Sequence, residues 1–188
     1  MKLTCAQRTR PCSGFTASGD LVVVRQEGDA TMLAVVDVLG HGPSAAEVAQ
    51  QASACLRRVD LEADVEAWTY QLHEALSRTR GAAVGLGRSR GSDLQLAVVG
   101  NVAIASCGTR VGIVASPGIV GRRLRKLRTF SFSMKTGDRL ALYSDGLRHV
   151  DMTSTCDLSL ERACESIMAT HATAADDASL LLTDFHDA

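Results

Sequence analysis

The sequence predicts an α+β fold, in which a few helices pack on mostly antiparallel β-sheets. Short runs rich in valine and alanine, separated by glycine, asparagine and serine, indicate many short strands. Two amphipathic helical patterns follow one another in the first half of the chain, and a third stands alone near its end. The helices are thus segregated from the strands instead of alternating with them, which is typical of α+β proteins.

The first half of the chain predicts a β-hairpin followed by two helices. Glu27-Gly28-Asp29 separates two apolar runs and is typical of a hairpin turn. The second run ends in a loop with two glycines and a proline, after which Ser44 is predicted to cap a helix. The expected elements are strands Leu21–Arg25 and Thr31–Val36, a helix from Ser44 to about Val59, and a helix over Glu62–Arg80.

From Ala82 the pattern changes to short strand-like runs, which predict an antiparallel meander. A third helix is expected over Leu160–His171, just before the last strand. The expected strands are Ala82–Gly87, Leu94–Val99, Val102–Cys107, Val111–Val114, Leu127–Met134, Arg139–Tyr143 and Ala178–Thr183.

Length and composition favour a single domain over residues 1–188. Hydrophobic residues make up 46% of the chain and aromatic residues only 4%, so aliphatic side chains must fill the core. The net charge of −1 argues against non-specific binding to nucleic acid or to an anionic membrane surface.

No apolar run approaches the roughly 20 residues that span a bilayer, and the N-terminus lacks the apolar segment of a signal peptide. We therefore expect a cytoplasmic protein with no membrane partner. The six cysteines form no Cys-x-x-Cys pair and have no zinc-finger spacing. Reduced thiols, without a structural disulfide network, are the expectation for that compartment.

Four aspartates stand where apolar strands begin or end: Asp20, Asp37, Asp145 and Asp176. A single such aspartate is ordinarily a turn residue or a cap. Neighbouring strands bring their ends together, and carboxylates gathered there repel one another unless a cation neutralises them. Mg²⁺ and Mn²⁺ prefer oxygen ligands, and two such ions about 4 Å apart activate a shared water and hold a phosphoryl group for attack.

Three segments resemble the ordered motifs of the PP2C-type (PPM) phosphatases in their bacterial SpoIIE branch. They are Asp37-Val38-Leu39-Gly40-His41-Gly42, Tyr143-Ser144-Asp145-Gly146-Leu147 and Asp176-Asp177-Ala178-Ser179. Residues 100–102 and 117–121 also resemble a short stress-signalling member of that branch. The resemblance covers nearly the whole chain, and the first two motifs together are specific. It implies a β-sandwich of mostly antiparallel sheets flanked by helices, with two divalent cations, Mn²⁺ or Mg²⁺, at one end.

The resemblance also implies the roles of individual residues. Asp37 would bridge both metals, and the backbone carbonyl of Val38 would face one of them. Asp145 and Asp176 would bind the other metal, and Asp20 would support the site directly or through water. Asp37 and Asp145 are therefore the expected catalytic centre.

The loop after Asp37 provides possible accessory residues. Glycine is expected at positions 40 and 42, because side chains there would obstruct the close approach of the loop to the metals. His41 is either a general acid for the leaving seryl oxygen or a residue that shapes the loop, and we favour the second interpretation.

The arginines depart from the family pattern. Eukaryotic members carry a phosphate-binding arginine shortly before the first acidic motif, whereas here Arg8 and Arg10 reach the site only if the N-terminal segment folds back. A basic cluster around Arg122, Arg123 and Arg125 has two interpretations. It is either a charged edge strand protected against aggregation or a docking strip for an acidic phosphoprotein.

The predicted function is hydrolysis of phosphoserine or phosphothreonine on a protein by a metal-activated water. The resemblance implies phosphorylated STAS-domain proteins of a stressosome-like complex as substrates. Two alternatives stay open. A non-catalytic binding module of the same fold would be expected to have lost metal-binding aspartates, and a phosphatase of small phosphoesters would need a deeper pocket with groups for its substrate.

Overall fold

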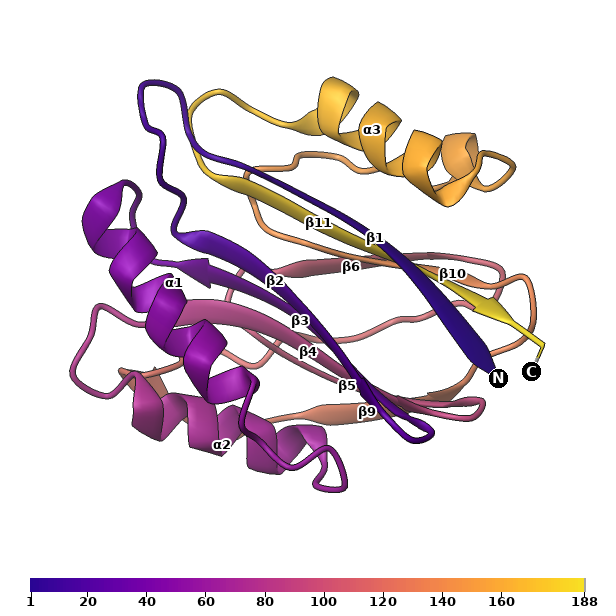
Figure 1. Cartoon of the computed structure of the whole chain (residues 1–188), viewed down its shortest axis with the longest axis horizontal. Coiled ribbons are helices and arrows are strands. Elements are labelled where there is room, and N and C mark those ends of the chain that lie inside the picture. The colour runs from indigo at the N-terminus through magenta and orange to yellow at the C-terminus, as the bar shows by residue number, and fades with distance from the viewer. Residues whose placement is uncertain (188) are drawn as a thin grey trace.

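The computed structural model describes residues 1–187 and has four layers, with two β-sheets face to face and helices on both outer faces (Figure 1). One sheet has the strand order β1 (Lys2–Arg10), β11 (Ala178–His186), β10 (Arg139–Tyr143), β6 (Ala103–Cys107). The other has the order β2 (Asp20–Glu27), β3 (Ala30–Val38), β4 (Ala82–Arg90), β5 (Asp93–Val99), β9 (Thr129–Ser133). Neighbouring strands in both sheets pair antiparallel.

The helices cover opposite faces of this sandwich. Helices α1 (Pro43–Leu56) and α2 (Val65–Ala75) pack on the β2–β5 face, and α3 (Leu160–His171) packs on β1 and β11. A short hairpin of β7 (Gly118–Ile119) and β8 (Arg123–Leu124) and a single turn η1 (Thr153–Thr155) complete the elements. Among residues 1–187, no helix is long and apolar enough to cross a membrane.

Successive side chains of a strand point to opposite faces of the sheet, and the buried hydrophobic side chains form three layers. On β3, Leu33 and Val35 point between the sheets, whereas Ala34 and Val36 point toward α1 and α2. Trp68 of α2 is fully buried in the helix-side layer. A third layer lies between the β1–β11–β10–β6 sheet and α3. The predicted α+β class and the sandwich of antiparallel sheets flanked by helices are thus confirmed.

Several element boundaries differ from the prediction. Helix α1 begins at Pro43 with Gly42 as its N-cap, so Ser44 is not the cap. Helix α2 is shorter than predicted at both ends. It starts at Val65, because the Asp64 side chain caps it by accepting a hydrogen bond from the Ala67 N–H at 2.8 Å. Residues 111–114 form no strand. Strands β1, β7 and β8 were not predicted.

Strand β1 lies at the edge of its sheet and pairs with β11 along its whole length, from Lys2 opposite His186 to Arg10 opposite Ala178. The two ends of the chain therefore lie side by side (Figure 1). Most β1 side chains are exposed, so the strand lacks the apolar run by which buried strands are recognised.

The prediction of reduced thiols is wrong for two cysteines. Cys107 at the end of β6 and Cys156 just after η1 form a disulfide, while Cys5, Cys12, Cys55 and Cys164 are free. The two partners are 49 residues apart in sequence, and only the packing of the loop after β10 against β6 brings them together. No local spacing signals such a pair.

We expect reduction of this disulfide to lower the free energy of unfolding by about 2–4 kcal/mol, because cross-linking so long a loop restricts the unfolded chain. Urea unfolding with and without dithiothreitol measures the difference. A Cys107→Ser/Cys156→Ser variant should unfold at the midpoint of the reduced protein and should not respond to dithiothreitol. An unchanged midpoint on reduction would contradict the prediction.

Candidate metal centre

The layer of apolar side chains between the sheets ends at the C-terminal end of β3, on the left in Figure 1, where acidic side chains follow. Leu33 and Val35 point between the sheets, and by alternation Asp37 points the same way. Asp20, at the start of β2, pairs directly opposite Asp37 and shares this face with Val22. Both carboxylates therefore lie where the inter-sheet core ends.

The facing sheet brings hydroxyl groups to these carboxylates. Ser144 follows β10 on the same face as Leu140 and Leu142 and is fully buried. Its Oγ donates to Asp20 Oδ2 at 2.5 Å and accepts from the Ser179 N–H at 2.9 Å. This chain of hydrogen bonds joins the two sheets at their acidic end.

Burial and repulsion by neighbouring carboxylates raise the pKa values of Asp20, which is buried, and of Asp37, which is half-buried. Burial raises the pKa of Asp20, which is only 5% exposed, to about 7, although hydrogen bonds from two serines oppose the rise. The pKa of Asp37 is raised to about 8, and burial is the largest cause. Repulsion by other carboxylates adds to this rise, in decreasing order from Asp20, Asp145, Asp176 and Asp177. Aspartates distant in sequence therefore share one electrostatic environment.

Asp145 and Asp177 are held differently. Asp145 is exposed, and its Oδ2 accepts a hydrogen bond from the Asn101 side-chain amide at 2.6 Å. Asp177 is buried, and its two oxygens accept from the backbone N–H groups of Cys12 and Gly19 at 2.7 and 2.6 Å. Asp177 thus fixes the loop before β2. The role of Asn101 was missed, because a lone amide before a strand gives no local signal.

The donor set fits a hard divalent cation. Carboxylate oxygens are what Mg²⁺ and Mn²⁺ prefer, and Mg²⁺ commonly takes one or two carboxylates and completes its shell with water and phosphate. A cation would also relieve the repulsion that raises the pKa of Asp37. Within residues 1–187, no group of three or more acidic, histidine or cysteine side chains is placed so that it could hold a metal ion by itself. Water would therefore have to complete the coordination.

A comparison with models of protein families shows the family to which this chain belongs. The model of the family Stage II sporulation protein E (SpoIIE) matches residues 27–188. The chain belongs to the SpoIIE family. This family is of PP2C type, as the motifs around Asp37 and Asp145 predicted. No curated protein sequence matches the chain.

Solved structures share the fold. A structure from work on the bacterial stressosome as a modular system controlling secondary-messenger signalling is 28% identical, covers 97% of this chain and 100% of that chain, and has a TM-score of 0.89. RsbX in complex with magnesium is 19% identical, with coverages of 97% and 94% and a TM-score of 0.85. The SpoIIE phosphatase domain of Bacillus subtilis, with a fragment of its regulatory domain, is 16% identical, with coverages of 98% and 64% and a TM-score of 0.78.

In this SpoIIE-family chain, the loop after Asp37 depends on glycine for its backbone. Gly40 and Gly42 have φ values of 83° and 76°, in the left-handed region that glycine favours. A Cβ at Gly40 would lie 2.7 Å from Arg80, and one at Gly42 would lie 2.7 Å from the Phe15 ring. The His41 ring contacts the same Phe15 ring, with centroids 4.7 Å apart. This contact supports the loop-shaping interpretation of His41.

The N-terminal arginines do not point to the acidic end. Arg8 pairs with a glutamate of α3 at 3.3 Å, and Arg10 donates to a carbonyl between α3 and β11 at 2.5 Å. Arg80 contacts the loop after Asp37 instead. Its guanidinium donates to Leu39 O at 3.0 Å and to Ser44 Oγ at 2.9 Å. Arg80 therefore braces the loop that positions Asp37.

The basic cluster lies on the β7–β8 hairpin, not on an edge strand of either large sheet. Arg122, Arg123 and Arg125 are exposed, whereas Leu124 packs against the helix-side core. Backbone hydrogen bonds between Val120 and Ala82 attach the hairpin to the start of β4. Because the next residue of β4 pairs with Asp37, the basic cluster lies at the acidic end of the sandwich.

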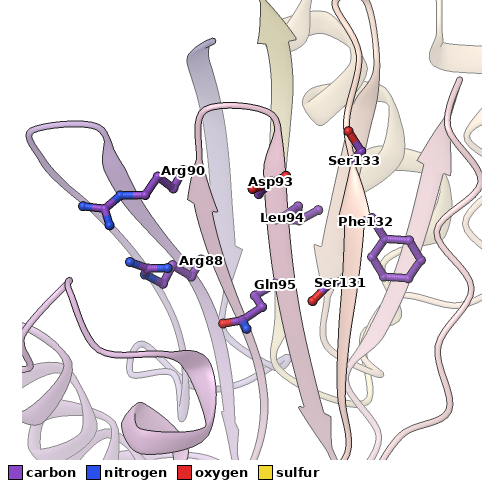
Figure 2. A pocket seen from close by; sticks show the side chains of 8 residues that line it. All are labelled: Arg88, Arg90, Asp93, Leu94, Gln95, Ser131, Phe132 and Ser133. Atoms are coloured by element: carbon purple, nitrogen blue, oxygen red, sulfur yellow. The ribbon is translucent and has the colours of Figure 1, made fainter.

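A cavity of about 460 Å³ lies at the opposite end of the strands, over β4, β5 and β9. Figure 2 shows Arg88, Arg90 and Gln95 projecting to one side of the sheet and Phe132 to the other. Both arginines of this cavity have partners within the protein. Arg90 forms ion pairs with Asp29 and Glu62, and Arg88 donates hydrogen bonds to two backbone carbonyls. The acidic residues of the candidate metal centre do not line it.

Proposed function

We propose that this chain is a metal-dependent protein serine/threonine phosphatase. The observation that carries the proposal is the convergence of aspartates at the end of the inter-sheet core, where neighbouring carboxylates help raise the pKa of Asp37 to about 8. An arrangement that crowds negative charge in this way is unfavourable by itself and suits divalent cations.

In this proposal the metals are two Mn²⁺ or Mg²⁺ ions. Asp37 would bridge them, and the carbonyl of Val38 would bind one. Asp145 and Asp176 would bind the other, with Asp20 supporting the site from its hydrogen bond with Ser144. When bound, the cations would supply Lewis acidity toward the phosphoryl group and lower the pKa of water. Asn101 would orient Asp145.

The proposed substrates are phosphorylated STAS-domain proteins of a stressosome-like complex in the cytoplasm. Two similar structures support this choice, one from work on the bacterial stressosome and one of RsbX. A non-catalytic module is disfavoured because the acidic residues are all present and share one environment. A phosphatase of small phosphoesters is the remaining rival.

A comparison of two substrates tests the proposal. Wild-type protein would be assayed with Mn²⁺, with Mg²⁺ and with excess EDTA on a phosphorylated STAS-domain protein and on p-nitrophenyl phosphate. The proposal expects metal-dependent release of phosphate, with the larger kcat/KM for the phosphoprotein. Turnover confined to the small substrate would favour the rival, and metal-dependent turnover of neither would favour a binding module.

Charge reversal on the basic hairpin tests docking. We expect Arg123→Glu/Arg125→Glu to lower kcat/KM for the phosphoprotein by about tenfold more than for p-nitrophenyl phosphate, because exposed charges act mainly on association. High salt should shrink the difference, since it screens exposed charges. Equal losses on both substrates would count against docking at this hairpin.

A further inference from the structure

A separate cavity of about 400 Å³ borders Asp145 at the edge of the β1–β11–β10–β6 sheet. Tyr143 at the end of β10 and Ala103 at the start of β6, which pair with each other, are among the residues that line it. Arg148 and His149 contribute cationic or titratable side chains to its lining. It therefore opens beside a carboxylate of the candidate metal centre and presents groups of opposite charge.

The segment that carries Arg148 and His149 is held in place by the end of α3. The Arg148 N–H donates to His171 O at 3.0 Å, and His171 Nδ1 contacts Arg148 O at 2.9 Å. His149 has a φ of 54° and is the sole non-glycine residue with positive φ in residues 1–187. Such a backbone is uncommon and persists where the surrounding structure enforces it. The lining is thus built on a fixed backbone.

The charge of Arg148 is not used inside the protein. The guanidinium takes part in none of the ion pairs formed among residues 1–187, and the side chain is exposed. Arg90, in the cavity at the other end of the sheet, is neutralised by Asp29 and Glu62. An unpaired arginine on a fixed backbone is available to an external carboxylate.

The β7–β8 hairpin carries further cationic side chains, on the side of the acidic end opposite to Arg148. A cavity of about 360 Å³ there is lined by Arg123 and Arg125. This hairpin packs on the α1–α2 side of the sandwich, whereas Arg148 stands on the α3 side. Cationic groups therefore flank the acidic centre on both sides, which favours an acidic chain segment crossing between them.

We propose that the cavity beside Asp145 is a substrate subsite in which Arg148 binds the carboxylate of an aspartate or glutamate flanking the phosphorylated residue. This rests on the proposed phosphatase function and adds to it the chemical class of the segment that is recognised. The crowded aspartates would repel an acidic segment, and Arg148 offsets that repulsion at one defined position. Arg148 therefore selects an acidic residue on its own side of the phosphoserine, whereas Arg123 and Arg125 lie on the other side.

The experiment uses the full chain with Mn²⁺ and three phosphoserine peptides. One has glutamates N-terminal to the phosphoserine, one has them C-terminal, and one has lysines at both positions. The proteins are wild type, Arg148→Glu, Arg148→Gln and Lys2→Glu. Lys2→Glu is the matched charge reversal, because Lys2 is exposed at the far end of β1, opposite His186.

In wild type we expect kcat/KM for one glutamate peptide to exceed that for the lysine peptide by about tenfold. Arg148→Glu should remove that advantage, Arg148→Gln should remove part of it, and Lys2→Glu should keep it. An unchanged preference in folded Arg148→Glu would overturn the proposal. An equal loss for both glutamate peptides would also overturn it, because it would indicate a general electrostatic attraction and not recognition at one position. Absence of metal-dependent turnover of any peptide by wild type would instead overturn the phosphatase function itself.

Discussion

Asp37→Asn and Asp145→Asn should each lower kcat on any phosphoester by roughly a thousandfold. Each replacement removes a charged oxygen from the proposed metal centre, and a metal's contribution to transition-state stabilisation is worth several kcal/mol. Steady-state phosphate release at saturating Mn²⁺ measures the loss. Binding of Mn²⁺ followed by calorimetry should weaken in parallel.

The fold should survive both changes, because asparagine has nearly the shape of aspartate and removes repulsion among the carboxylates. Circular dichroism and thermal unfolding of the metal-free variants check this point. Asp93→Asn is the matched control, since Asp93 is exposed at the start of β5, away from the acidic end. Wild-type turnover in a folded Asp37→Asn or Asp145→Asn protein would refute the assignment of the centre.

The strand-end aspartates could be anticipated from sequence because each stands beside a run that local pattern identifies as a strand. The pairing of Asp20 opposite Asp37 follows from the hairpin of β2 and β3, which the Glu27-Gly28-Asp29 turn specifies. What brings Asp145 and Asp176 near them is the packing of one sheet on the other, which only the family resemblance supplied.

The roles of other residues in the centre carry no local signal, although the residues lie in segments that resemble the family. Ser144 and Asn101 act through single hydrogen bonds to aspartates far along the chain, at separations of 124 and 44 residues. A serine after a strand and an asparagine before one are ordinary turn residues. The Cys107–Cys156 disulfide was missed for the same reason, since it depends on a tertiary contact.

The acidic end also predicts an unusual dependence of stability on pH and metal. In the metal-free protein the folded-state pKa values are about 7 for Asp20 and about 8 for Asp37, both above their values in the unfolded chain. Between about pH 4 and pH 8 the folded state therefore binds more protons than the unfolded state. Stability from these groups is fully present below pH 4 and is lost as the pH rises toward 8.

We expect the free energy of unfolding of the metal-free protein to fall by about 6 kcal/mol between pH 5 and pH 8, because the carboxyl groups of Asp20 and Asp37 ionise without a counterion. Saturating Mn²⁺ should reverse the trend, since metal binding requires the ionised carboxylates and so strengthens with pH. Asp37→Asn should reduce the fall by about half in the metal-free protein. Urea unfolding across this range with EDTA or Mn²⁺ measures each effect. A metal-free protein whose stability stayed level or rose toward pH 8 would show that the aspartates do not share the crowded environment on which the proposed centre depends.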